Sequence, residues 1–321
     1  MLRAVLELLA GFAILTIGGS LMVRGAVSIA LLSGLSTAVI GLTVIAFGTS
    51  LPELAVSVNA AANGSTDIAY ANVVGSSIFN VAVILAVTAL FRPVIIPKET
   101  RSYDYPTMLA VLAACLVLGR DRLISRPEGA ALLAGLVVFL ALTYVRTRSD
   151  APAPAKGPEW NIKPPPHDSP ARHRWLVSLG LVAVGILGLW GGSVFMVRGA
   201  VTIAESWGIS QRVIGLTIIA MGTSLPELTT SIMPARQGED EIAFSNLMGS
   251  NIFNILAVLG TTSLLFPVPV HPRAAALDNW VMLASGVALL PILLTSSKVN
   301  RWHATLLLTG FALYLAALVG L

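Results

Sequence analysis

The sequence predicts an all-α integral membrane protein of ten transmembrane helices, arranged as two five-helix repeats of inverted topology. Three observations lead to this fold class. Of the 321 residues, 55% are hydrophobic and 11% are charged, and the mean hydropathy is +0.83, whereas a soluble domain has about 25% charged residues. Apolar stretches long enough to cross a bilayer follow one another along the chain. The second half of the chain also repeats the first.

Composition excludes several classes of function. The hydropathy rules out an ordinary soluble enzyme, and we find no nucleotide motif or catalytic dyad. The net charge of +4 does not indicate a nucleic-acid partner, because the basic residues lie at the ends of apolar runs. Cys115 is the single cysteine, so we expect it to pack rather than to form a disulfide or a thiolate metal site. No resident cofactor and no obligate protein partner are expected.

Ten apolar segments have the length of a membrane-spanning helix. They lie at 4–24, 35–62, 67–91, 104–119 and 127–146, and at 175–197, 209–235, 241–266, 276–296 and 302–321. Shifting the chain by 174 residues aligns Met22–Pro93 with Met196–Pro267 without gaps, at 39 identities in 72 positions. Because each repeat holds an odd number of helices, the second copy enters the membrane from the opposite side, as in many secondary transporters.

The two repeats, 1–146 and 175–321, are separated by a proline-rich, basic stretch at 147–174. Proline at this density without apolar periodicity predicts an extended linker. The side of the membrane that holds the linker has 13 Lys and Arg residues and the other side has 7. By the positive-inside rule, the linker is expected in the cytoplasm and both termini outside.

One hexapeptide occurs twice inside these apolar runs, as Gly48-Thr49-Ser50-Leu51-Pro52-Glu53 and as Gly222-Thr223-Ser224-Leu225-Pro226-Glu227. On a helix, Thr49, Ser50 and Glu53 share one face. Pro52 has no N–H, so the carbonyl of Gly48 loses its helical partner and the helix is expected to bend. Hydroxyl, carboxylate and freed carbonyl oxygens are ligands for hard cations such as Na⁺ and Ca²⁺. Each copy thus predicts half of a cation site on a broken helix.

A second polar segment follows each copy. Ser76 and Asn80 are spaced i, i+4, as are Ser250 and Asn254. Inverted symmetry can bring all four segments to one centre, and the absence of His, Cys and Asp from them argues against zinc or iron. Simpler interpretations exist, since hydroxyls and asparagines also join neighbouring membrane helices. Two buried glutamates favour function, because uncompensated burial of a carboxylate costs several kcal/mol.

Other polar residues are expected to be structural. Asp104 and Asp278 lie at predicted helix starts, where capping near the interface suffices. Arg24 and Arg198 are expected to extend to the interface as anchors. The glycines at Gly41, Gly75 and their repeat copies are expected to allow close helix packing.

With these motifs the chain resembles the sodium/calcium exchangers of the cation/calcium exchanger superfamily, of the prokaryotic type. The resemblance covers nearly the whole chain and is most specific in two α-repeats, Gly41–Leu90 and Gly215–Leu264. It implies a Na⁺/Ca²⁺ antiporter in the inner membrane of a bacterium or archaeon, with the lipid bilayer, Ca²⁺ and Na⁺ as partners. It also implies alternating access by sliding of the first and sixth helices, which carry Gly18–Arg24 and Gly191–Arg198.

The family's ligands match twelve positions of this sequence. The resemblance implies that Glu53 and Glu227 are the central ligands of the transported cation, and that Thr49 and Thr223 join them as metal ligands. The remaining implied ligands are Ser50, Ser224, Ser76, Asn80, Ser250, Asn254 and the carbonyls of Ala46 and Ala220.

One departure leaves the coupling open. Some family members carry an aspartate where this chain has Asn254, so the two glutamates alone give a site charge of −2. Protons could replace Na⁺ at buried carboxylates, which keeps a Ca²⁺/H⁺ antiporter as an alternative. A cation channel is a further alternative, although channels usually build their ligand rings by oligomeric symmetry.

Overall fold

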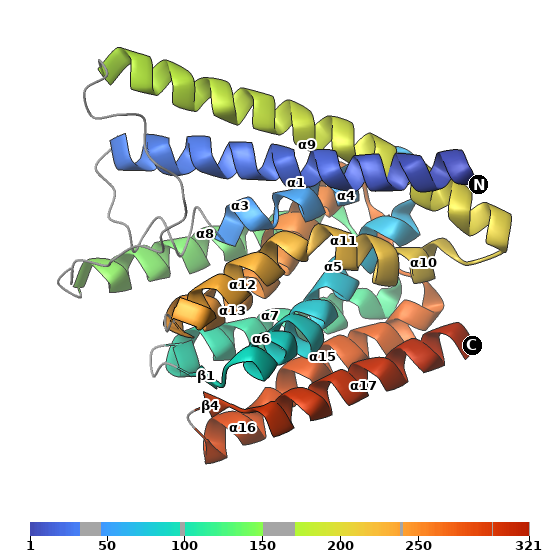
Figure 1. Ribbon diagram of the computed structural model, residues 1–321. Helices are drawn as coiled ribbons and strands as arrows, with labels where there is room; N and C mark the ends of the chain where they lie inside the picture. Colours follow the sequence, from blue (N-terminus) through green and yellow to red (C-terminus); the bar gives the residue numbers. More distant parts are fainter. Residues whose placement is uncertain (33–45, 97–99, 150–170, 238–239, 297, 321) are drawn as a thin grey trace.

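The computed structural model describes residues 1–32, 46–96, 100–149, 171–237, 240–296 and 298–320, and these are almost entirely helical (Figure 1). Gly41, the first part of the predicted helix 35–62 and most of the predicted linker 147–174 lie outside the described residues. In the first half of the chain the elements are α1 (Leu2–Leu32), α3 (Ala46–Thr49), α4 (Leu51–Ala62), α5 (Thr66–Phe79), the π-turn η2 (Asn80–Ile84), α6 (Leu85–Phe91), β1 (Val94–Ile95), the π-turn η3 (Thr100–Asp104), α7 (Tyr105–Leu118), the 3₁₀ turn η4 (Gly119–Asp121), β2 (Leu123–Ile124) and α8 (Arg126–Ser149).

The second half follows the same order. Its elements are α9 (Ala171–Trp207), α10 (Gln211–Ile214), the π-turn η5 (Gly215–Ile219), α11 (Ala220–Thr223), α12 (Leu225–Gln237), α13 (Asp240–Phe253), the π-turn η6 (Asn254–Leu259), α14 (Gly260–Leu265), β3 (Val268–Pro269), the π-turn η7 (Ala274–Asp278), α15 (Asn279–Val287), α16 (Leu289–Thr295), β4 (Lys298–Val299) and α17 (Arg301–Gly320).

Seven helices of the described chain are long and apolar enough to cross a membrane, and one bent pair, Gln211–Thr223 with Leu225–Ile232, gives an eighth if it counts as one span. These coincide with eight of the predicted segments. Segment 35–62 is described only from residue 46. Segment 302–321 forms α17 but is not among the seven. The count of ten helices therefore stays a prediction.

Two spans form the centre of the molecule. In Thr66–Phe91 and Ala243–Leu265, 83% of the apolar window is buried, against 17% to 39% in the other five. These are the helices that carry the second polar segment of each repeat. The predicted polar faces therefore lie in the interior of the protein rather than against lipid.

Helices α1 and α9 lie side by side along one edge of the molecule and run in opposite directions (Figure 1). Their contact is lined by Gly11, Gly18 and Gly25 on α1 and by Gly185, Gly192 and Gly199 on α9. A Cβ added at Gly18 would lie 2.8 Å from the backbone N of Leu189, and one at Gly192 would lie 2.7 Å from that of Leu15. Backbones this close require small residues at the contact. The α9 glycines are the α1 glycines shifted by 174 residues, so the repeat packs against its own copy.

The predicted close packing at Gly75 is confirmed. A Cβ added there would lie 2.8 Å from the Cβ of Ala220, so α5 approaches α11 of the other half at this residue. Gly215 has the same function in η5, where an added Cβ would lie 2.7 Å from the Cβ of Ala71.

The fold is not purely helical, which the sequence did not indicate. Two antiparallel pairs of two-residue strands join the halves: β1 pairs with β4, and β2 pairs with β3. Pro267 and Pro269 flank or end one strand, where short edge strands tolerate proline. Each pair links the end of a central helix to the loop between the last two helices of the other half.

The prediction that Asp278 caps a helix at the membrane interface is wrong. The helix begins at Ala274, one turn earlier, so Asp278 lies inside the span and is fully buried. Nε and Nη2 of Arg212 donate to its two carboxylate oxygens at 2.6 and 2.9 Å, and the hydroxyl of Tyr314 donates at 3.0 Å. The repeat-equivalent Asp104 instead faces Arg146 at 4.0 Å in a partly exposed position. The Arg212–Asp278 pair ties α10 to η7.

We expect Gly192→Ala to destabilise the protein, because the added Cβ would meet the backbone of α1 at 2.7 Å. The expected loss is about 1–3 kcal/mol in the free energy of unfolding, measured as a lower Tm of the detergent-solubilised protein. The neighbouring Gly191→Ala is the matched control, since nothing lies within 4 Å of its added Cβ. Equal Tm values for the two variants would contradict the packing of α1 against α9.

Asp278→Asn should be strongly destabilising, by about 3–5 kcal/mol, because it leaves the charge of Arg212 buried and unpaired. The double variant Arg212→Met/Asp278→Leu removes both charges and should regain most of that loss in the same Tm measurement. Asp104→Asn is the repeat-equivalent control and should cost less than about 1 kcal/mol, since its ion pair is partly exposed. A double variant less stable than Asp278→Asn would contradict this explanation, because removing both charges leaves no unpaired charge buried.

Candidate functional site

Both copies of the repeated hexapeptide interrupt a helix. Ser50 separates α3 from α4 with φ −82° and ψ 3°, and Ser224 separates α11 from α12 with φ −88° and ψ 9°. The two helical directions on either side of Ser224 differ by 46°. The predicted bend is thus present, but the interruption falls two residues before the proline. Pro52 lies in the first turn of the new helix, where a missing N–H does no harm.

The interruption gives each glutamate a helix N-terminus. Glu53 lies in the first turn of α4 and Glu227 in the first turn of α12, and both are 0% exposed. The unpaired N–H groups and the dipole of a helix N-terminus favour a carboxylate. This local field lowers the cost of burying each charge without supplying a positive counter-charge.

The partner segments are equally buried. Ser76 lies on α5 and Ser250 on α13, and the two asparagines, Asn80 and Asn254, open the π-turns η2 and η6. All four side chains are 0% exposed. Single π-turns inside α-helices often occur at functional sites, because they shift the side chains that follow. The same distortion at the same repeat position indicates a shared function.

The four polar segments meet between the halves. Helix α4 packs against α5 and η6, and α12 packs against α13 and η2. Each glutamate-bearing helix therefore contacts the partner segment of its own half and the π-turn of the other half. The Ser224 hydroxyl donates directly to Oε1 of Glu53 at 3.0 Å, which joins the two copies of the hexapeptide.

This centre carries more polar atoms than the protein itself satisfies. In the described part of the chain, the buried atoms without a hydrogen-bond partner include Ser50 Oγ, Glu53 Oε2, Ser76 Oγ, both amide atoms of Asn80, both carboxylate oxygens of Glu227, Ser250 Oγ and both amide atoms of Asn254. Folded proteins satisfy nearly all buried polar groups, so such a cluster requires an explanation. Its oxygens are those that a hard cation prefers.

Two carboxylates and neutral polar groups make up this cluster. No group of three or more His, Cys, Asp or Glu side chains that could hold a metal ion occurs among the described residues. The predicted carbonyl ligand of Ala220 already accepts hydrogen bonds from Ser224 N at 3.1 Å and from Thr223 Oγ1 at 3.3 Å. Ala46 begins α3, and Thr49 is buried at the end of that helix. Their function as ligands stays a prediction.

Sequence reasoning missed a supporting pair of asparagines. Asn72 on α5 donates to the carbonyl of Glu53 at 3.2 Å and to Ser57 at 3.0 Å, and its amide oxygen accepts from Thr223 at 3.2 Å. Its repeat copy, Asn246, donates to Thr230 at 2.7 Å, and Thr230 in turn donates to the carbonyl of Glu227 at 3.0 Å. The identity of the two asparagines across the repeat was the available signal.

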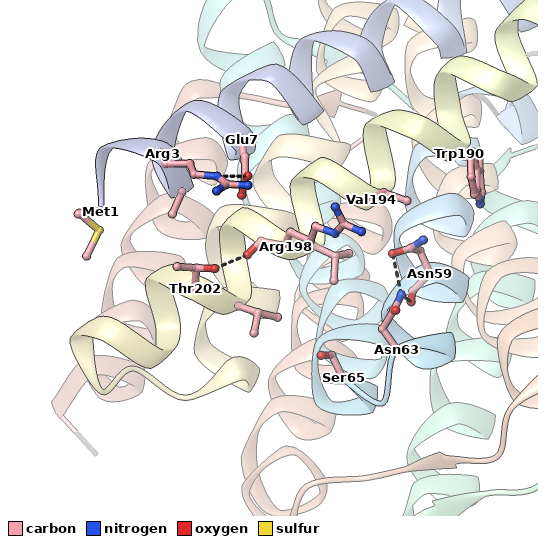
Figure 2. A pocket seen from close by; sticks show the side chains of 13 residues that line it. Met1, Arg3, Glu7, Asn59, Asn63, Ser65, Trp190, Val194, Arg198 and Thr202 are labelled. Carbon is pink, nitrogen blue, oxygen red and sulfur yellow. Dashed lines mark hydrogen bonds and ion pairs between the residues drawn. The ribbon is translucent and has the colours of Figure 1, made fainter.

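A cavity of about 800 Å³ lies beside the helix that carries Glu53 (Figure 2). It lies between the N-terminal end of α1, the C-terminal end of α4 and α9. Its polar lining includes Arg3, Glu7, Asn59, Asn63, Ser65, Arg198 and Thr202. Trp190 lines it too, and the neighbouring Leu189 lies with Pro52 around Gly19 of α1. The cavity therefore reaches α4 at its C-terminal end, at Asn59.

The α1–α9 pair touches both interruptions. A Cβ added at Gly19 of α1 would lie 3.6 Å from Cγ of Pro52. One added at Gly222 would lie 2.8 Å from Cε of Met196 and 3.6 Å from a ring carbon of Phe12. A displacement of this helix pair would change the surroundings of both half-sites.

A helical membrane protein with a buried, twice-repeated set of oxygen ligands at its centre belongs to the class of ion transporters. The comparison with known proteins gives the family: the family model described as "Sodium/calcium exchanger protein" matches residues 3–145 and 177–320, so this chain belongs to the sodium/calcium exchanger family. The resemblance indicated by the two hexapeptides is thereby confirmed.

Relatives match over nearly the full length. The putative antiporter CaxA of Alkalimonas amylolytica is 38% identical over 318 residues, covering 98% of each chain. The sodium/calcium exchanger MaX1 of Methanosarcina acetivorans is 30% identical over 346 residues, covering 98% of this chain and 97% of the relative. A solved structure of the sodium-calcium exchanger NCX_Mj, soaked with Na⁺ and Ca²⁺, matches with a TM-score of 0.67 at 29% identity, over 98% of this chain and 97% of that one.

We expect Ser76→Ala to weaken Ca²⁺ binding without destabilising the cation-free protein. The Ser76 hydroxyl is buried and has no hydrogen-bond partner within the described chain, so its removal relieves an unsatisfied group. In a chelator, the Tm should be unchanged or higher, and the rise in Tm on adding Ca²⁺ should shrink.

The adjacent Ser77→Ala is the matched control. The Ser77 hydroxyl is equally buried but donates to the carbonyl of Val73 at 2.9 Å. Its loss should cost about 0.5–1.5 kcal/mol of stability and leave the Ca²⁺-induced rise in Tm intact. The reverse pattern for the two serines would contradict the proposed ligand set.

Proposed function

We propose that this protein is a secondary-active antiporter that exchanges Na⁺ for Ca²⁺ by alternating access to one central site. The observation that carries this proposal is the cluster of buried oxygen atoms without hydrogen-bond partners around Glu53 and Glu227. A dehydrated cation satisfies all of these oxygens at once and neutralises the carboxylates. No covalent chemistry is required.

Each ligand type has a separate role in this proposal. Glu53 and Glu227 neutralise the cation, while hydroxyl and amide oxygens replace its water shell. The neutral ligands are Thr49, Ser50, Ser76 and Asn80 in the first half, Thr223, Ser224, Ser250 and Asn254 in the second, and the carbonyls of Ala46 and Ala220.

Charge balance explains why transport would be an exchange. Two ionised glutamates balance one Ca²⁺ or two Na⁺, whereas a third Na⁺ would leave a net positive charge in a low-dielectric centre. Without a cation, two unpaired carboxylates are too costly for the site to reorient across the membrane. Only the loaded forms then cross, which couples one ion to the other.

The proposed architecture is ten transmembrane helices in two inverted repeats, 1–146 and 175–321, joined by the linker 147–174. The antiparallel α1–α9 contact supports the inversion, because its glycines occupy equivalent positions in both repeats. We place the linker in the cytoplasm and both termini outside, in the inner membrane of a bacterium or archaeon. The distribution of basic residues and the organisms of the relatives support this placement.

Na⁺ is the proposed coupling ion, since two relatives named sodium/calcium exchangers match over nearly the full length. Reconstituted protein tests this directly through ⁴⁵Ca²⁺ uptake into Na⁺-loaded proteoliposomes diluted into Na⁺-free buffer, with K⁺-loaded vesicles as the control. Uptake that requires internal Na⁺ supports the proposal. Uptake driven by an outward proton gradient alone would identify a Ca²⁺/H⁺ antiporter, and flux without any counter-ion would identify a channel.

Glu53→Gln should lower Na⁺-driven ⁴⁵Ca²⁺ uptake by about 100-fold or more, because one of the two neutralising charges is lost at a buried site. Glu205→Gln is the control, since Glu205 lies on an exposed position of α9 and should not affect uptake. Normal exchange by Glu53→Gln, at equal amounts of reconstituted protein, would refute the assignment of Glu53 to the central site.

A further inference from the structure

Two side-chain hydrogen bonds between the half-sites run from the second half of the chain to the first. Thr223 donates to the amide oxygen of Asn72 at 3.2 Å, and the adjacent Ser224 donates to Glu53 at 3.0 Å. Both donors belong to the second half of the chain and both acceptors to the first. We call these two contacts, which join the two halves of the chain, the cross-half bonds.

The mirror-image bonds are not made, although the sequence supplies every group for them. The repeat equivalents of the donors are Thr49 and Ser50, and those of the acceptors are Asn246 and Glu227. Within the described residues, Ser50 Oγ, the amide oxygen of Asn246 and both carboxylate oxygens of Glu227 have no hydrogen-bond partner. The difference is therefore one of conformation and not of composition.

The NH₂ groups of Asn72 and Asn246 are each bound within their own half of the chain, which leaves the amide oxygens for contacts with the other half. The NH₂ group of Asn72 is bound to the Glu53 carbonyl and to Ser57, and that of Asn246 to Thr230. Since each NH₂ group is fixed on its own half, each oxygen remains available to the opposite half. The oxygen of Asn72 accepts a cross-half bond, and that of Asn246 remains buried without one. An unsatisfied buried acceptor favours any conformation that would supply its donor.

We propose that Asn72 and Asn246 are positioning residues that alternate: the Thr223–Asn72 bond holds the conformation described here, and a Thr49–Asn246 bond replaces it when the site faces the other side. This inference rests on the alternating access proposed above. Access to the cavity of Figure 2 serves as the measure of the conformation described here, in which this cavity lies open between α1, α4 and α9. On the proposed topology it faces outside.

The proposal predicts opposite effects of equivalent substitutions. Asn72→Leu removes an accepted cross-half bond and should shift the population away from this conformation. Asn246→Leu removes an acceptor that only the opposite conformation satisfies, so it should shift the population toward the one described here. Each shift should be about three- to tenfold, the size expected for one neutral hydrogen bond.

Accessibility of the cavity measures this population without requiring transport. Asn59→Cys places a thiol on the cavity wall, and the single native cysteine, Cys115, is fully buried. The labelling rate with a membrane-impermeant thiol reagent, measured without transported cations, should fall when Asn72→Leu is added and rise when Asn246→Leu is added. Size-exclusion profiles and Tm values verify folding. If either leucine variant does not fold, Asn72→Ala and Asn246→Ala remove the same oxygens with less bulk.

Labelling rates that move in opposite directions support the alternation. The alternation is overturned if the two labelling rates change in the same direction, or if the rate of either variant stays unchanged. This outcome is separable from the proposed function: ion exchange with same-direction shifts removes the asparagine alternation and leaves the antiporter, whereas opposite shifts without ion exchange retain the switch and remove the antiporter.

Discussion

The structure depends on the burial of two carboxylates, Glu53 and Glu227, for which no ion pair is found among the described residues. The buried Arg212 pairs with Asp278, which also accepts a hydrogen bond from Tyr314, and therefore neutralises a different acid. Within the described residues, both Glu53 and Glu227 lie at helix N-termini, and the Ser224 hydroxyl donates a hydrogen bond to Glu53. Burying a carboxylate without a positively charged partner is costly in folding free energy. The interruption of both helices gives each carboxylate a helix N-terminus, which lowers this cost.

The polar segments of both repeats meet in one central cluster. Each glutamate-bearing helix packs against the π-turn of the other half, so neither repeat can complete its own site. The same dependence holds at the periphery, where each short strand pairs with a strand of the other half, and along the glycine-lined contact of α1 with α9. A chain built in this way buries its polar atoms against its own copy, which keeps lipid away from them.

Much of the site was predictable from the sequence because the same residues recur at one spacing in an apolar context. The two hexapeptides and the serine–asparagine pairs identified the segments that the fold brings together. The support around them was not predictable, since Asn72 acts through a carbonyl and a hydroxyl that only the tertiary packing places beside it. Asp278 was misjudged for a related reason: its helix starts a turn earlier than its polar residues indicate, and its partner is 66 positions away in sequence. The short strands gave no signal, because two residues carry no periodicity.

The similarity of the two halves, with 39 identities in 72 aligned positions, has a thermodynamic consequence. If the two repeats were equivalent in every contact, the inward and outward conformations would have equal free energy, and a small bias would decide which one is populated. The chain departs from the repeat around the cavity, where Arg3, Glu7 and Asn59 correspond to Val177, Leu181 and Met233. These polar lining residues of the cavity therefore have no polar counterpart at the equivalent positions of the second repeat. The residues that recur in both repeats make up the central polar cluster, whereas these residues around the cavity differ between the repeats.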